Sequence, residues 1–241
     1  MTASIDLDLR DLVDEGERVV AAVARSGADV EVQAATALAW AHHVFGDRLV
    51  IASSMTGEVL VHLASRVVPG IDVLFLDTGY HFAETIGMRD ATAAMLPVQV
   101  RTALPLLTMA QQDAEHGPRL HERDPDLCCA LRKVEPLNRE LAGYDAWVSG
   151  MRRAETASRR EIPIVGWDEK RGMLKLNPLA GWTDEDVDAY VERYDVMLHP
   201  LRSIGYASIG CEPCTRPVAP GEDPRAGRWS GTGKTECGIH A

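Results

Sequence analysis

The residues of this sequence best suited to chemistry are its five cysteines. Four of them form two pairs, the adjacent Cys128 and Cys129 and the Cys-Glu-Pro-Cys motif of Cys211 and Cys214, about eighty residues further on. A lone Cys-x-x-Cys motif is ambiguous, because zinc sites and redox dithiols share it. Adjacent helical cysteines point about 100° apart, which suits a multi-iron cluster better than one zinc ion, whose ligands are usually two to four residues apart. The pattern therefore favours an iron–sulfur cluster, with a zinc site or buried structural thiols as the alternatives.

The residues around the first cysteine pair predict a helix that suits an anionic cluster. Asp124 is a typical N-cap, and Pro125 follows at the first helical position. The positive end of that helix dipole would stabilise the negative charge of a thiolate-bound cluster. Lys133 lies four residues after Cys129 and so on the same helix face, where it would neutralise part of that charge.

The fifth cysteine, Cys237, lies four residues from the C-terminus. Lys234 and His240 lie three residues away on either side and favour the reactive thiolate, whereas Glu236 opposes it. A mobile Gly-rich tail is able to carry a nucleophile first to a pocket and then to a partner. The alternative is an incidental exposed thiol.

The elements that must position these cysteines alternate along the chain. Helical patterns over residues 9–25 and 30–45 come first, and later helical patterns cover 58–67, 83–95 and 182–194, the last capped by Thr183. Between them lie the strand patterns RLVIASS, IDVLFLDTG, VQVRT, AWVSG and MLKLNPL. This alternation predicts an α/β fold with a single doubly wound, mostly parallel sheet, whose ligands bind beyond the carboxyl ends of the strands. The loops 53–57 and 77–80 would converge there.

The remaining sequence divides the chain. We expect residues 1–204 to form one α/β nucleotide-binding domain, with residues 1–45 as its helical N-terminal segment, and residues 151–172 to be an Arg-rich loop. The Gly- and Pro-rich residues 205–241 form an irregular tail that carries the Cys-x-x-Cys motif and Cys237.

Bulk composition excludes several classes of protein. The chain has 241 residues, of which 46% are hydrophobic, enough for one sizeable core. A net charge of -11 and a pI near 5.2 argue against nucleic-acid binding, which requires a basic face. No run approaches the roughly 20 apolar residues that span a membrane, and the acidic N-terminus is not an export signal. We therefore expect a cytoplasmic protein, where five cysteines are not expected to form disulfides.

Several motifs, in order, resemble one family. The sequences LDTGYHF, CCALRKVEPL, the Gly-Met-Arg-Arg turn after AWVSG, IGCEPCT, DPRAGRW and KTECGIH resemble the assimilatory adenylyl-sulfate reductases. These belong to the phosphoadenylyl-sulfate reductase family, which has a pyrophosphatase-loop fold of the adenine nucleotide alpha hydrolase type. The resemblance runs from about residue 48 to residue 240. It implies a [4Fe–4S] cluster held by Cys128, Cys129, Cys211 and Cys214, with Cys237 as the catalytic nucleophile.

The resemblance also implies a binding site for the substrate. Guanidinium and ammonium groups suit sulfate and phosphate oxygens, although an Arg-Gly-Arg loop is often only solvated surface. The usual Ser-Gly-containing, Asp-ended phosphate loop appears here as Ser-Ser-Met-Thr-Gly-Glu over residues 53–58. Small residues at strand ends are also ordinary turn formers, and Arg159 fits the family spacing better than Arg160. The implied contacts to the sulfate are Lys133, Arg225, Arg228 and His240, and those to the nucleotide are Ser53, Ser54, Thr78, Gly150 and Arg159.

The activity implied by the resemblance is thioredoxin-dependent reduction of adenylyl sulfate to sulfite and AMP in sulfate assimilation. Cys237 would attack the sulfur and form an S-sulfocysteine. With four cysteines as cluster ligands, no thiol in the chain remains to resolve that adduct, so thioredoxin, as an external dithiol, is the expected partner. We also expect a homo-oligomer. The alternatives are a reductase of phosphoadenylyl sulfate and, from another class, an iron–sulfur redox sensor; an ATP-dependent adenylating enzyme would need the intact phosphate loop.

Overall fold

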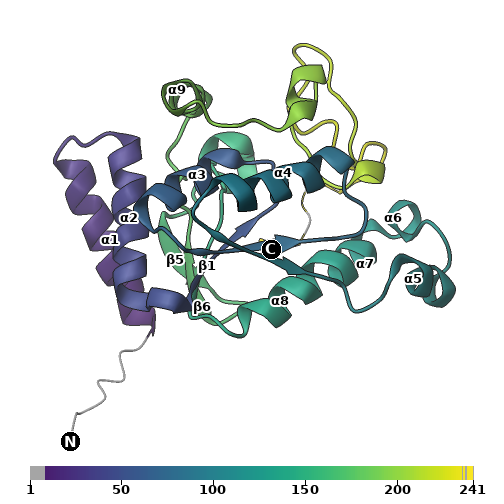
Figure 1. The fold of residues 1–241 in the computed structure, drawn as a ribbon, viewed down its shortest axis with the longest axis horizontal. Coiled ribbons are helices and arrows are strands. Elements are labelled where there is room, and N and C mark those ends of the chain that lie inside the picture. The colour runs from purple at the N-terminus through teal and green to yellow at the C-terminus, as the bar shows by residue number, and fades with distance from the viewer. Residues whose placement is uncertain (1–8, 235, 237, 241) are drawn as a thin grey trace, which may run out of the picture.

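The computed structural model describes residues 9–234, 236 and 238–240 and contains a six-stranded sheet (Figure 1). The strand order is β3-β2-β1-β4-β6-β5, and all neighbours are parallel except the antiparallel pair of β5 and β6. This confirms the predicted doubly wound, mostly parallel sheet. The strands are β1 (Leu49–Ser53), β2 (Asp72–Leu76), β3 (Gln99–Ala103), β4 (Ala146–Val148), β5 (Val165–Asp168) and β6 (Met173–Leu176).

The long helices match their predictions, except that the last begins at Asp184, two residues after the predicted start. They are α1 (Leu9–Arg25), α2 (Val30–Phe45), α3 (Glu58–Val67), α4 (Ala83–Met95) and α9 (Asp184–Tyr194). Thr183 caps α9 as predicted, because its side chain accepts a hydrogen bond from the backbone N–H of Asp186 in a capping box. The shorter helices are α5 (Met109–His116), α6 (Leu120–Arg123), α7 (Pro125–Cys129) and α8 (Glu135–Leu141).

Two apolar clusters cover the two faces of the sheet. Alternate side chains of a strand point to opposite faces, so that Leu49 and Ile51 join one cluster and Val50 joins the other. The first cluster packs under α1, α2, α3, α4 and α9, and the second packs under α8 through Leu137 and Leu141. The carboxyl edge of the strands therefore lies between two helical layers, where loops from both layers meet.

One segment differs from its prediction. Residues 151–172 are not only a loop, because they contain β5 and the 3-10 turns Arg153–Glu155 and Ala157–Arg159. β5 is an edge strand of four residues that pairs with β6 through the turn before Met173. A strand so short, with a glycine inside it and an aspartate at its end, lacks the alternating pattern that would have identified it. No helix among the described residues is long and apolar enough to cross a bilayer.

Candidate functional site

Four thiols from two distant segments line one pocket at the carboxyl edge of the sheet. Cys128 and Cys129 come from α7, whereas Cys211 immediately precedes the 3-10 turn Glu212–Cys214 and Cys214 ends it. We call this the thiol pocket. Its other lining residues are Thr78, Tyr80, His121, Pro125, Arg132, Lys133, Pro213 and Trp229. The two predicted cysteine pairs thus lie together, with Lys133 beside them as predicted.

Local sequence explains how α7 presents its two thiols. The Asp124 side chain accepts a hydrogen bond of 2.9 Å from the backbone N–H of Leu127, and Pro125 occupies the first turn, as predicted. Immediately after Cys129 the helix widens into a π-helical turn, Ala130–Val134, before continuing as α8. Single π turns are frequent at functional sites. This one carries Lys133 to the wall of the thiol pocket.

The second cysteine pair is held by the backbone of neighbouring loops. The N–H of Glu212 donates to the carbonyl of Tyr80 at 2.7 Å, and the Thr78 hydroxyl lies 3.3 Å from the sulfur of Cys211. On the other side, the N–H of Trp229 donates to the carbonyl of Cys214 at 3.0 Å. Thr78, which the sequence assigns to nucleotide binding, therefore lies against a cysteine.

A short antiparallel contact closes the loop that follows this pair. Thr215 and Arg228 form an isolated β-bridge, and the N–H of Arg216 donates to the carbonyl of Gly227 at 2.9 Å. The Arg228 guanidinium lies 4.5 Å from the centre of the Trp229 ring and 3.3 Å from the hydroxyl of Ser208. Arg228 was predicted to be one of the residues around the sulfate. It packs on Trp229, which lines the thiol pocket.

Arg132 is a functional residue that the sequence reasoning missed. Its side chain is 3% exposed, and it donates to the carbonyls of Thr78 and Leu107 and to the side-chain oxygen of Gln112. Its guanidinium also lies 5.1 Å from the centre of the Tyr80 ring. One buried cation thereby ties three segments to the wall of the thiol pocket. The one feature of the sequence that pointed to Arg132 is that it directly precedes Lys133, which was predicted to lie at the site.

Burial sets the protonation of the thiols. It raises the pKa of Cys128 to about 12, an effect that the other three thiols add to and the Arg132 charge opposes. Burial likewise raises the pKa of Cys214 to about 11, with Cys211 adding to it and Lys133 opposing it. A metal centre would have to displace these protons on binding. Across residues 9–234, 236 and 238–240, no group of three or more His, Cys, Asp or Glu side chains could hold a metal ion.

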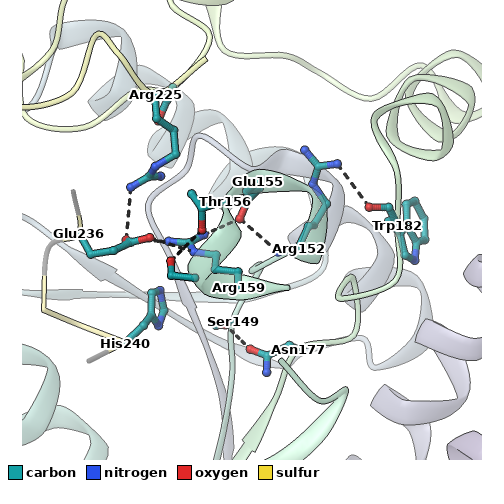
Figure 2. A network of polar contacts seen from close by, with 12 residues as sticks. Ser149, Arg152, Glu155, Thr156, Arg159, Asn177, Trp182, Arg225, Glu236 and His240 are labelled. Atoms are coloured by element: carbon teal, nitrogen blue, oxygen red, sulfur yellow. Dashed lines mark hydrogen bonds and ion pairs between the residues drawn. The ribbon is translucent and has the colours of Figure 1, made fainter. Parts of the chain in front are cut away.

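A second group of charges surrounds the described part of the C-terminal tail (Figure 2). The Glu236 carboxylate accepts hydrogen bonds of 3.1 and 2.8 Å from Nε and Nη2 of Arg159, and one of 3.2 Å from Nη2 of Arg225. Lys175 and His240 lie beside this ion pair, with Nζ of Lys175 3.3 Å from Nδ1 of His240. We call Arg159, Lys175, Arg225, Glu236 and His240 the tail clamp.

The end of the tail packs on the sheet as well. The His240 ring stacks on Trp147 at a centroid distance of 5.7 Å and an interplanar angle of 7°. Ile239 packs against the second apolar cluster. Burial lowers the pKa of His240 well below its usual value, and nearby cations, Lys175 first among them, lower it further. Burial also lowers the pKa of Lys175 to about 8.

The tail connects the two groups. Lys234 forms an ion pair with Asp126 in α7 and lies 5.7 Å from the centre of the Trp229 ring. Gly238 lies near the π-helical turn, because a Cβ built there would be 3.7 Å from a methyl of Val134. Glu236 and Gly238 flank Cys237, the predicted nucleophile, which lies outside the described residues.

The predicted nucleotide residues lie at the ends of neighbouring strands. The Ser53 hydroxyl accepts a hydrogen bond of 3.1 Å from the N–H of Met55, and the hydroxyls of Ser54 and Thr56 lie 2.8 Å apart. Met55 is buried and has a φ of 55°, a backbone conformation that non-glycine residues rarely adopt. Gly150 follows β4, the strand that pairs with β1. This loop thus departs from a glycine-lined phosphate loop in structure as well as in sequence.

The predicted basic residues therefore divide into two groups. Lys133 lines the thiol pocket and Arg228 packs on its Trp229, whereas Arg159, Arg225 and His240 belong to the tail clamp. The sequence analysis did not identify Lys175, which lies in β6. The one feature of the sequence that pointed to it is that it is a charged residue within an otherwise apolar strand.

Comparison with known proteins gives a consistent result. Residues 48–217 match the model of the phosphoadenosine phosphosulfate reductase domain. The chain is 57% identical to the adenosine 5'-phosphosulfate reductase of Streptomyces coelicolor, over 93% of this chain and 95% of that protein. It is 51% identical to the phosphoadenosine 5'-phosphosulfate reductase of Gloeobacter violaceus, over 85% of this chain and 87% of that one. Among solved structures, the Candida auris phosphoadenylyl-sulfate reductase in a phosphate complex has a TM-score of 0.68 at 25% identity and covers 87% of this chain and 97% of its own.

Proposed function

This chain belongs to the phosphoadenosine phosphosulfate reductase family, and on that premise we propose that it reduces adenylyl sulfate to sulfite and AMP in sulfate assimilation. Relatives from Streptomyces coelicolor and Mycolicibacterium smegmatis, 57% and 48% identical over nearly the whole chain, are both named adenosine 5'-phosphosulfate reductase. Such an enzyme is an oxidoreductase that acts on sulfur. A nucleotide substrate agrees with a site at the carboxyl edge of a doubly wound sheet.

One observation carries the proposal: the tail residues on either side of Cys237 bridge two groups of functional side chains. Glu236 lies in the tail clamp, among cations that suit a phosphosulfate. Lys234 pairs with Asp126 in the helix that bears Cys128 and Cys129, and Gly238 lies near the π-helical turn that follows this helix. The described neighbours of the proposed nucleophile in the sequence therefore reach both the oxyanion-binding groups and the segment that carries the thiol pocket. A tail with a purely structural role would need neither the oxyanion-binding groups nor the thiol pocket beside it.

The reaction follows from the chemistry of a thiolate. The Cys237 sulfur attacks the sulfate sulfur of adenylyl sulfate, an S–S bond forms, and the bond from sulfur to the phosphate oxygen breaks. AMP leaves with that electron pair, and the enzyme carries an S-sulfocysteine. Arginine and lysine side chains that bind phosphate oxygens would stabilise the charge that develops on the departing AMP.

Sulfite release requires two electrons from a dithiol. One thiolate of the dithiol attacks the Cys237 sulfur, sulfite leaves, and its second thiol then resolves the mixed disulfide and restores the Cys237 thiol. The dithiol is oxidised to a disulfide, and the sulfur goes from sulfate to sulfite. We propose thioredoxin as this reductant, and a cytoplasmic location, where thioredoxin is kept reduced.

We further propose that the thiol pocket holds a [4Fe–4S] cluster on Cys128, Cys129, Cys211 and Cys214. The donor set fits, because four largely buried thiols face one space with Lys133 beside them, and four cysteine thiolates are the usual ligands of such a cluster. When bound, the cluster supplies an anionic centre that organises charge near Lys133, with no electron transfer assigned to it.

The basic residues then take distinct roles. Lys133 and Arg228, on the side of the thiol pocket, and Arg225 and His240, in the tail clamp, would bind the sulfate group. Arg159 would bind the nucleotide phosphate. Ser53, Ser54, Thr78 and Gly150, at the ends of β1, β2 and β4, would line the remainder of the nucleotide site.

A second candidate substrate is phosphoadenylyl sulfate. The Gloeobacter violaceus relative, at 51% identity, and the Candida auris structure are both named as reductases of that nucleotide. The chemistry at Cys237 would be the same for both substrates, and the difference would be a 3′-phosphate at the nucleotide end. Side-by-side kcat/KM values for the two nucleotides separate the candidates.

The experiment that tests the proposal is anaerobic purification followed by an assay. The protein should contain about four irons and four sulfides per chain and should release sulfite from adenylyl sulfate only when reduced thioredoxin is present. Sulfite release that survives Cys237→Ser would refute the mechanism. Zinc in place of iron would refute the cluster.

A further inference from the structure

The tail places a carboxylate where a substrate oxyanion would bind. Glu236 accepts three hydrogen bonds from Arg159 and Arg225, the first through the paired Nε and Nη2 donors of its guanidinium (Figure 2). This two-donor edge is the geometry with which arginine binds carboxylate and phosphate alike. Resting on the proposed function, we infer that Glu236 and an oxyanion of the nucleotide compete for the same guanidinium pair.

The Arg159 side chain is oriented by the body of the protein as well as by the tail. Its Nη1 pairs with the carboxylate of Glu155, and that carboxylate also accepts a hydrogen bond of 3.1 Å from the backbone N–H of Arg152. Arg152 is in turn fixed by an ion pair of 2.7 Å to Asp184. The donor edge made by Nε and Nη2 therefore faces the tail even when Glu236 moves away.

The charges make an empty donor edge unfavourable. The side chains of Arg159 and Arg225 are only 11% and 19% exposed. Leaving the donors of a largely buried charge without an acceptor is costly. Glu236 pairs with both guanidinium groups, so the Nε and Nη2 donors of Arg159 need another acceptor when it leaves. Either Glu236 or a phosphate or sulfate oxygen meets that need, and the two cannot occupy the same donors together.

The consequence concerns the residue next in the chain. Because Glu236 directly precedes Cys237 in the sequence, an arriving nucleotide that displaces the Glu236 carboxylate also breaks a contact that holds the tail next to the proposed nucleophile. Glu236 is thus a positioning residue, which couples nucleotide binding to the placement of the tail. A molecule whose Arg159 donors are occupied by Glu236 cannot offer these donors to the nucleotide. The apparent affinity for the nucleotide therefore falls as the fraction of such molecules rises.

The test uses the holoenzyme and three variants, with calorimetric binding of AMP and of adenosine. Glu236→Gln keeps the size of the side chain but removes the charge that competes, so the Kd for AMP should fall about threefold or more. The Kd for adenosine, which has no phosphate, should not change. Glu236→Asp keeps a carboxylate, and its Kd for AMP should lie closer to that of the parent protein than the Kd of Glu236→Gln does.

Glu222→Gln is the matched control, because Glu222 also pairs with an arginine of the tail, Arg216, but lies outside the tail clamp. It should leave the Kd for AMP unchanged. Unchanged or weaker AMP binding in Glu236→Gln, or equal tightening in Glu222→Gln, overturns the inference. If the parent protein binds neither AMP nor adenylyl sulfate, the proposed function fails instead, so the two failures are distinguishable.

Discussion

The thiol pocket and the tail clamp lie at the same edge of the sheet but are held together by different forces. The thiol pocket is fixed by backbone hydrogen bonds, such as that from Glu212 to Tyr80, and by the buried Arg132. The tail clamp is held mainly by side-chain charges, with Glu236 between two arginines. Backbone contacts suit a site that must keep its shape for a permanent cofactor, whereas ion pairs between side chains suit a site whose contents exchange in every turnover.

The largest effects should come from substitutions of the cysteines, which separate the role of the thiol pocket from that of the tail. Cys211→Ser removes a proposed cluster ligand and should lower both iron content and sulfite release to background. Cys237→Ser should also abolish sulfite release, because it removes the proposed nucleophile, yet leave the iron content and visible absorbance intact. Iron and sulfide analysis beside a sulfite assay measures both. Loss of iron in Cys237→Ser would show that the two roles are not separate.

Arg132 tests whether the thiol pocket depends on its buried cation. Arg132→Met leaves the acceptors on Thr78, Leu107 and Gln112 without their donor. The free energy of unfolding should fall by about 2–4 kcal/mol, since each buried acceptor without a partner costs about 1–3 kcal/mol. Urea unfolding of the holoenzyme measures it. Arg10→Met, which breaks the exposed pair with Glu169, should change stability by less than about 1 kcal/mol.

Lys175 tests whether the tail clamp works through charge. Its pKa of about 8 means that the side chain loses its charge as the pH rises through 8. The Kd for AMP should therefore rise several-fold between pH 7 and 9, and in Lys175→Met it should be weak and nearly constant across that range. AMP binding is the right measurement, because it does not depend on the proposed reaction at Cys237. The charged groups that influence Lys175 are Asp168, Arg171 and Arg159.

Lys175 should have opposite effects on AMP binding and on stability: its positive charge favours AMP binding but destabilises the folded chain. The pKa of Lys175 is lower in the folded chain than in the unfolded chain, so between pH 8 and the usual lysine value the unfolded chain holds more protons. The free energy of unfolding contributed by this group therefore increases with pH across that window. Lys175→Met should accordingly stabilise the protein at pH 7 while it weakens AMP binding. If Lys175→Met instead lowers both the free energy of unfolding and the affinity for AMP, the explanation that this largely buried charge is kept for AMP binding is contradicted.

The smallest expected effect concerns the helix caps. Asp124→Ala and Thr183→Ala each remove a side-chain cap and should each cost about 1 kcal/mol of stability. Only Asp124 caps the helix of Cys128 and Cys129, so only its variant should lose iron faster to a chelator. Equal iron loss in both variants would mean that general stability, rather than the local helix, holds the thiol pocket together.

Local sequence patterns were enough to predict most of the fold, and the two cysteine pairs together with the family resemblance predicted the thiol pocket. The Asp124 and Thr183 caps and the strand that ends at Ser53 depend on neighbours within a few residues, so each is visible in a short window. β5 was missed because its pairing with β6, rather than its own four residues, makes it a strand.

The tail clamp could be predicted only in part. Arg159, Arg225 and His240 were named from the resemblance, but the link from Arg159 to Glu236 spans 77 residues and no local pattern encodes it. Lys175 was missed because a lysine in a strand normally indicates a solvent-facing position, and its contacts to Trp147 and His240 depend on a neighbouring strand and on the far end of the chain. Contacts made between distant segments are decided by the whole fold.

The β-bridge between Thr215 and Arg228 has a practical use. Because it closes the loop at its base, Trp229 returns beside Cys214 whatever the length of the excursion between them. The tip at Pro220 and Gly221 is exposed, and exposed loop tips accept insertions well. A small fluorescent label introduced at this tip would sit on the same loop as Arg225, and it offers a way to follow the tail during turnover without altering either group of functional residues.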